Sequence, residues 1–261
     1  MIRDIFVSLG IEILKIRKSI IFWISIGISV FISLIMGMFM YFIMHPDILP
    51  PGLLKTKVNL AAVAANWPSY FSFLVMIASI LGIILFGFMV SWIFGREYSD
   101  KTVKDLLALP ASRTAIVISK LLALILWSML VCLLIIITSL GTGGFIGLPL
   151  WSVKGLFYFI RIFFITTFLS LLLSPPVAYV ASAGRGYLPP IGVVIGCMGL
   201  ANLFANIGLG AYFPWSIPLL YSNSVEGPGS ELSVLSIIIL VLTSLAGIFG
   251  TILQWKYADQ H

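Results

Sequence analysis

The chain has 261 residues, of which 61% are hydrophobic and only 9% are charged, with a formal net charge of +6. In soluble domains about a quarter of the residues are charged. This composition therefore excludes an ordinary soluble protein and indicates an integral membrane protein. Membrane topology accounts for the basic excess, which therefore predicts no nucleic-acid partner.

Residues 1–18 are predicted to form an amphipathic helix at the cytoplasmic membrane interface. Its basic residues, including Lys15, Arg17 and Lys18, lie away from one apolar face. This pattern is typical of interfacial helices. Two interpretations remain open, a simple membrane anchor and a helix that also contacts a partner. The apolar face comprises Ile2, Ile5, Phe6, Leu9, Ile13 and Ile16.

Residues 19–261 are predicted to form one transmembrane domain of the all-α class. A helix needs roughly 20 apolar residues to cross a bilayer core, and six charge-free runs are long enough. Helices are required because the bilayer offers no water to satisfy backbone groups, and barrel strands would be shorter and alternating. The predicted spans are about 19–44, 70–94, 121–140, 162–183, 188–212 and 232–254.

The distribution of Lys and Arg predicts the orientation. If both termini are cytoplasmic, 11 of the 15 basic residues lie inside, and four, Lys55, Lys57, Lys154 and Arg161, lie outside. This is the positive-inside bias of plasma-membrane proteins. The chain is therefore predicted to be a multi-pass protein of the plasma membrane.

The loop of residues 95–120 carries the most charged stretch of the chain, "REYSDKTVKDLLALPASR". Thr102 and Asp105 match a capping box, Val103, Leu106 and Leu107 provide a small apolar face, and Pro110 ends the pattern. A helix of about two turns is too short to be stable alone in water. It is expected either to lie on the headgroups and neighbouring helices or to dock into a soluble partner.

This loop, the six spans and the N-terminal helix together resemble the permease subunits of type-2 ABC exporters. A second stretch, "AGRGYLPPIGVVIGCMGLANLFANIGLGAYFPWSIP", is similar to the bacitracin-type or multidrug branch. The resemblance implies a cytoplasmic coupling helix that docks on a separate ABC ATP-binding subunit, in an assembly of two permeases and two ATPases. The residues that take the docking positions are Glu97, Thr102, Val103, Leu106, Leu107, Pro110 and Arg113. Glu97 is expected to pair with a basic group and orient the loop.

The sequence predicts no catalytic or metal site of its own. It contains no G-x-x-x-x-G-K-[ST] phosphate loop, so ATP and Mg²⁺ are expected on the partner, with no cofactor on this chain. Every Asp and Glu lies outside the six apolar runs, which disfavours ion-coupled transport. His45 and His261 are the only histidines, which leaves little for membrane-embedded hydrolysis.

Three features inside the spans have alternative interpretations. Pro175 and Pro176 either kink or end the fourth span, and a kink is favoured. Gly192 and Gly196 form a G-x-x-x-G that packs either within the chain or across a permease dimer. Asn202 and Asn206 share one face of the fifth span and either bond across helices or face the transport pathway.

These observations predict the permease subunit of an ABC exporter for an amphipathic or hydrophobic compound, such as a peptide antibiotic, a drug or a lipid-like molecule. The alternative is a membrane scaffold that recruits a non-ATPase protein through residues 96–113. Co-purification of a protein with a phosphate loop would distinguish the two.

Overall fold

The computed structural model describes residues 2–48, 64–103, 112–223 and 232–257. Within these ranges the regular elements are all helical, and six helices are long and apolar enough to cross a membrane. The fold class predicted from the sequence is therefore confirmed. The six are α2 (Ile20–Met44), α4 (Trp67–Ser99), α6 (Arg113–Ile146), the pair α7 (Val153–Leu171) and α8 (Ser174–Ala183), α9 (Leu188–Asn206) and α11 (Val234–Tyr257).

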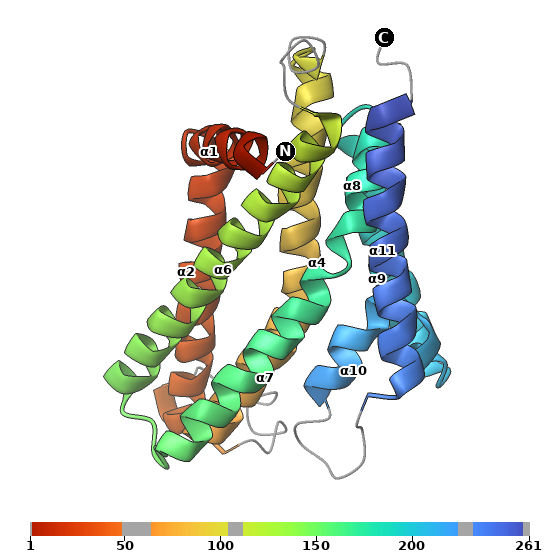
Figure 1. Ribbon diagram of the computed structural model, residues 1–261. Coiled ribbons are helices and arrows are strands. Elements are labelled where there is room, and N and C mark those ends of the chain that lie inside the picture. The colour runs from red at the N-terminus through yellow and green to blue at the C-terminus, as the bar shows by residue number, and fades with distance from the viewer. Residues whose placement is uncertain (1, 49–63, 104–111, 224–231, 258–261) are drawn as a thin grey trace.

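The remaining elements are short or lie at the ends of the bundle. Helix α1 (Ile2–Arg17) lies across one end, above α2, as Figure 1 shows. The C-terminal ends of α11 and α4 and the N-terminal end of α6 are at this same end. The short elements are η1 (Pro46–Ile48), η2 (Gly210–Tyr212), η3 (Pro214–Ser216) and α10 (Ile217–Asn223).

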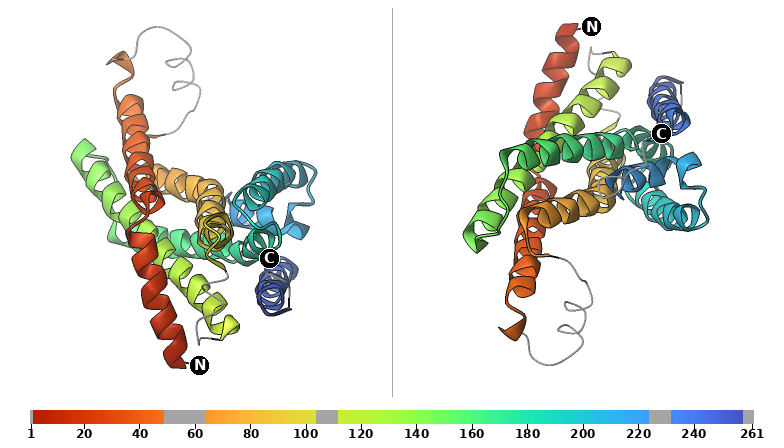
Figure 2. Two further views of the ribbon diagram at one scale, coloured as in Figure 1. Left: turned by 90° about the horizontal axis from the view of Figure 1, so that it is seen from above. Right: turned by 90° about the horizontal axis from the view of Figure 1, so that it is seen from below.

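Helix α4 is the central helix of the bundle. It packs against α7 and α8 and also contacts α2, α6, α9 and α10 (Figure 2). Its N-terminus is capped by Asn66, whose side-chain oxygen accepts a hydrogen bond from the Ser69 amide at 2.9 Å. Many of its side chains, including Tyr70, Met89 and Phe94, are fully buried. This explains why α4 is hydrophobic all round and lacks a polar face.

Helices α2 and α6 pack through a row of small residues. Ser25, Ser29, Ser33 and Gly37 recur every fourth position of α2 and are all buried. The Ser33 hydroxyl lies 2.8 Å from the Thr138 hydroxyl of α6, and the Trp127 indole donates to Ser25 at 2.9 Å. Because apolar burial does not drive helix association in lipid, such close contacts and interhelical hydrogen bonds hold the two helices together.

The fourth span is interrupted but does not end at the two prolines. Helix α7 ends at Leu171, and α8 begins at Ser174 with Pro175 and Pro176 in its first turn. A proline is tolerated there because the first amides of a helix lack intrahelical partners. Helix α8 then packs closely against α11. The span thus continues past the prolines as two helices separated at Leu172 and Leu173, and its first helix starts at Val153.

Helix α1 packs against α6 differently from the predicted pattern. Ile16 is buried and Leu9 packs against the core, whereas Phe6 is 68% exposed and Ile13 is 41% exposed. The inward side also carries Glu12, which is only 4% exposed. The predicted apolar stripe is therefore divided between two faces, because the inward face is selected by charge pairing as well as by hydrophobicity. The position of α1 at a membrane interface stays a prediction.

Candidate functional site: the base of the loop between α4 and α6

The loop begins with a tight turn at the C-terminus of α4. Lys101 has a left-handed backbone with φ of 58°, and the Thr102 amide donates to the Glu97 carbonyl at 2.9 Å. The Lys101 amide donates to the Tyr98 carbonyl at 3.2 Å. These two bonds form a Schellman motif, which satisfies carbonyls that the helix end would otherwise leave unpaired. The turn directs the chain back toward the bundle immediately before residue 104.

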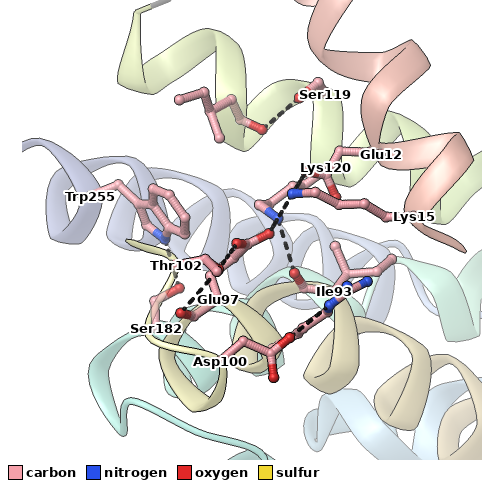
Figure 3. A network of polar contacts seen from close by, with 12 residues as sticks. Glu12, Lys15, Ile93, Glu97, Asp100, Thr102, Ser119, Lys120, Ser182 and Trp255 are labelled. Carbon is pink, nitrogen blue, oxygen red and sulfur yellow. Dashed lines mark hydrogen bonds and ion pairs between the residues drawn. The ribbon is translucent and has the colours of Figure 1, made fainter. Parts of the chain in front are cut away.

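The Glu97 side chain points into the protein at this turn. It is 3% exposed, and its Oε2 accepts a hydrogen bond from the Thr102 hydroxyl at 2.7 Å. Its Oε1 lies 2.8 Å from Lys120 Nζ and 2.9 Å from Lys15 Nζ, as Figure 3 shows. Glu97 therefore pairs with basic groups, as expected from the sequence, and connects the loop to α6 and α1 at once.

Glu12 completes a group of two acids and two bases, in which Lys15 is partly exposed and the other three are buried. Its Oε1 lies 3.2 Å from Lys120 Nζ and 3.1 Å from Lys15 Nζ. Lys120 is fully buried and also donates to the Ile93 carbonyl at 3.1 Å. We call Glu12, Lys15, Glu97 and Lys120 the charge cluster. It joins α1, α4 and α6, which are distant in the sequence.

The charge cluster is stable only as a complete set. Removing an ion from water costs several kcal/mol, and a buried pair compensates only when the geometry and hydrogen bonding are good. Here two positive charges face two negative charges at hydrogen-bond distance. Burial by itself lowers the pKa of Lys15, but attraction and hydrogen bonds from Glu12 and Glu97 outweigh this and raise the pKa above its ordinary value. Lys15 is therefore held in the charged form.

The far end of the loop is attached to a different helix. Ser112 caps α6 by accepting a hydrogen bond from the Ala115 amide at 3.2 Å. The Arg113 guanidinium donates to the carbonyls of Trp255 and Lys256, both at 3.1 Å. These carbonyls belong to the last turn of α11, where a cation is also favoured by the helix dipole. The two ends of the loop thus contact α1, α6 and α11.

The predicted docking residues fall into three groups. Glu97 and Val103 are buried within the chain, at 3% and 6% exposure. Thr102 and Arg113 bind other parts of the same chain, as described above. Leu106, Leu107 and Pro110, together with the predicted coupling helix, lie outside the described residues. Direct contact with a partner therefore stays a prediction for the middle of the loop, while its ends serve to position it.

The predicted residues of α9 lie on an outward face. A Cβ built at Gly192 or Gly196 meets nothing within 4 Å among the described parts of the chain. Packing of this G-x-x-x-G within the chain is therefore wrong for the described residues, because α9 contacts its neighbours through another face. Asn202 and Asn206 are exposed, and the Asn206 amide donates to the Asn202 side chain at 2.7 Å. A dimer contact at Gly192 and Gly196 stays a prediction, and so does a pathway contact at Asn202 and Asn206.

Three members of the charge cluster were not predicted as site residues. Lys15 was interpreted as part of the polar side of the N-terminal helix, Lys120 as an indicator of topology, and Glu12 was not singled out. Their positions carried one usable signal, since Lys120 stands at the start of a long apolar run and Glu12 interrupts the apolar pattern of the N-terminal helix. In the described parts of the chain, no group of three or more His, Cys, Asp or Glu could hold a metal ion.

Comparison with known proteins agrees with this architecture. A family model described as "ABC-2 family transporter protein" matches residues 8–198, nearly three quarters of the chain. The chain belongs to the ABC-2 transporter family. This permease is also 30% identical over 190 residues to the "Bacitracin transport permease protein BCRB" of Bacillus licheniformis, an alignment that covers 71% of this chain and 88% of the relative. It is therefore a multi-pass permease of the plasma membrane, and permeases of this family are not themselves catalytic.

Proposed function

We propose that this permease forms one half of the membrane pore of an ABC exporter, driven by ATP hydrolysis on a separate subunit. The observation that carries the proposal is the family match over residues 8–198. The substrate class that we infer is an amphipathic or hydrophobic compound, such as a peptide antibiotic, a drug or a lipid-like molecule. The name of the bacitracin permease relative and the apolar character of the spans support this class.

The proposed orientation places both termini and the loop between α4 and α6 in the cytoplasm. The bias of 11 basic residues against four supports it. The structure places α1, the end of α11 and both attachments of the loop at one end of the bundle. An ATPase bound at this end would act on all three.

The charge cluster could transmit an ATP-driven movement of the loop to the membrane-spanning helices. Thr102 and Arg113 stand on either side of residues 104–111, and both are bonded to the bundle. A pull on the loop would therefore act through Glu97 on α1 and α6, and through Arg113 on α11. Closure of two ATPases would tilt these helices as rigid bodies, which is a common type of switching movement.

A second permease copy is the proposed partner for the open face of α9. Gly192 and Gly196 leave room for another helix backbone to approach closely. Asn202 and Asn206 lie at the far end of the same helix, where they would meet the second copy or the transport pathway. Two permeases and two ATPases would then form the transporter.

Changing Leu106 and Leu107 together to Asp tests the proposal. Burial of each leucine is worth roughly 1.5–3 kcal/mol, and carboxylates in an apolar groove add a further cost. We expect the variant to insert normally but to lose co-purification of an ATP-binding subunit, stimulation of its ATPase activity and export. Ser99→Asp, which adds a carboxylate at an exposed position near the loop, is the control. Normal export by the double variant would show that the loop is not the coupling element.

A further inference from the structure

A groove runs between α2 and α4 on the outside of the bundle, starting beneath α1. It consists of two adjoining cavities of about 500 Å³ and about 380 Å³. The first is lined by Ser19 and Ile20 and the second by Ile21 onward, so the two follow one another along α2. On α4 the lining passes in the same direction from Arg96 and Trp92 to Met89. We call this the α2–α4 groove.

The upper cavity of the α2–α4 groove is lined by three cations. Lys15, Lys18 and Arg96 face it, together with one carboxylate, Asp100. Lys15 is paired within the charge cluster. Lys18 is exposed and forms no ion pair in the described parts of the chain. The cavity therefore holds uncompensated positive charge.

Arg96 is fixed in place while most of its donors stay available. Its Nε donates to Asp100 Oδ2 at 3.0 Å, and its guanidinium lies 5.1 Å from the centre of the Trp92 ring. An arginine has five N–H donors in a rigid fork, and this bond uses one of them. The two terminal amino groups form no hydrogen bond within the described ranges. A forked donor held in this way suits the oxygens of a phosphate.

The lower cavity of the α2–α4 groove is entirely different in character. Its lining is apolar apart from Ser25, with Ile21, Ile28, Leu85 and Phe88 among its residues. The residues of α2 that line it run from Ile21 to Ile32, a rise of roughly 16 Å at 1.5 Å per residue. Half of a bilayer hydrocarbon core is about 15 Å thick. The lower cavity therefore matches one leaflet in length.

Exposed apolar side chains at the groove favour an opening toward lipid. Leu14 and Ile20, which line the upper cavity, are 56% and 74% exposed. Such side chains at the end of a spanning helix are compatible with hydrocarbon and the headgroup boundary. An occupant would therefore enter sideways from the membrane.

We propose that the α2–α4 groove binds one anionic phospholipid from the leaflet on the α1 side, with its phosphate at Lys18 and Arg96 and an acyl chain along Ile21–Ile32. A soluble anion would use only the upper cavity, and a neutral hydrocarbon only the lower one. A molecule that carries both groups at this spacing is an anionic membrane lipid. The site does not depend on which compound is exported or on how ATP is coupled.

Lipid binding to the purified full-length chain tests the proposal. The protein in detergent is titrated with phosphatidylglycerol, with phosphatidylcholine of the same acyl chains, and with glycerol phosphate, and bound copies are counted by native mass spectrometry. We expect one tight phosphatidylglycerol, weaker phosphatidylcholine, and no retained glycerol phosphate. Lys18→Ala should weaken phosphatidylglycerol about fivefold, since one Lys near an anionic surface contributes on that scale.

Arg17→Ala is the matched control, because Arg17 is the exposed residue directly before Lys18, at the end of α1, and does not line the groove. It should leave the tight site unchanged, whereas Ile28→Trp should fill the lower cavity and weaken both lipids. Equal losses for Arg17→Ala and Lys18→Ala would overturn the proposal in favour of general surface attraction. Retention of glycerol phosphate as strongly as lipid would also overturn it, because the acyl half of the groove would then be irrelevant.

Discussion

The half of the bundle built from α1, α2, α4 and α6 is held by buried charges and hydroxyls, whereas α8 and α11 are held by close contact between backbones. In the first half, four charged side chains meet in the charge cluster, and serines of α2 face α6. In the second, Gly247 of α11 lies directly on the backbone of Pro175 and Pro176. Helix association in lipid relies on both kinds of contact, since apolar burial does not drive it.

Helix α9 provides a third case within the same chain. It is also rich in glycine, yet Gly192, Gly196 and Gly199 face open space in the described structure. Glycine thus allows close packing of α11 against α8, whereas in α9 it lies on a face that has no neighbour in the described structure. The difference teaches that a small-residue pattern indicates close approach without saying whether the partner belongs to the same chain.

The largest effect is expected from Lys120→Met. This change leaves Glu12 and Glu97 buried with only Lys15 as a counter-charge, and breaking a buried ion pair costs about 3–5 kcal/mol. The free energy of unfolding in detergent should fall by that amount, while Lys18→Met at an exposed position should have little effect. A combined Lys120→Met and Glu97→Gln variant should lose less than the sum of the single changes. Additive losses would show that the charges do not act as one cluster.

Gly247→Ala should have the next largest effect. A Cβ at this position overlaps the Pro175 and Pro176 backbone, which cannot move aside as a side chain could. We expect a loss of about 1–3 kcal/mol in unfolding free energy, as for overpacked cores. Gly196→Ala is the same chemical change on the open face, and it should be neutral or stabilising by up to about 1 kcal/mol because alanine favours the helix. Equal effects at the two positions would contradict the conclusion that Gly247 is closely packed and Gly196 is not.

Replacing Gly196 with Cys should affect association rather than folding. In a background without Cys132 and Cys197, the new thiol should form a disulfide between two copies in the membrane, provided that the α-carbons approach within about 7 Å. Gly144→Cys is the control, because Gly144 also meets nothing within 4 Å but lies on α6. Cross-linking at Gly144 with none at Gly196 would place the dimer contact elsewhere.

The smallest effect on stability is expected from Asn206→Leu. It removes an exposed hydrogen bond to Asn202, and such bonds in membrane proteins average about 0.6 kcal/mol. Stability should therefore change by less than this value, whereas export should fall if Asn206 faces the pathway. Asn206→Asp, which retains an acceptor but adds charge, should impair export further. Unchanged export by both variants would remove Asn206 from the pathway.

The sequence predicted the outline of the fold because each span must be a long apolar run. Every observed spanning helix overlaps one of the predicted ranges, although α4 and α6 extend beyond their predicted ends. The extra turns at the end of α4 and the start of α6 carry charged residues, including Arg96, Glu97 and Lys120, and charge was the criterion used there, whereas the extension of α6 to Ile146 is uncharged. Burial of Glu97 and Lys120 within the protein is what allows these helices to continue.

The candidate site was predicted less completely than the fold. Glu97 was expected to pair with a basic group because an acidic residue at the start of the loop would orient the loop, and it has two such partners. Which cations it finds depends on how α1 crosses α6, a contact between residues more than 100 positions apart. Arg113 was predicted to dock a partner, but in the structure it bonds the last turn of α11. No local pattern encodes that contact.

The sequence by itself determined that the protein crosses the membrane as helices, because apolar runs and backbone polarity leave no other structure in a bilayer. It also determined the family, since the loop and the six spans occur together along the chain. Only the tertiary structure decided which faces meet. Helical periodicity is identical for a face that packs inside the chain, as at Gly247, and one that does not, as at Gly196. The same is true of the α2–α4 groove, whose cationic and apolar parts become one surface only when two helices distant in the sequence lie side by side.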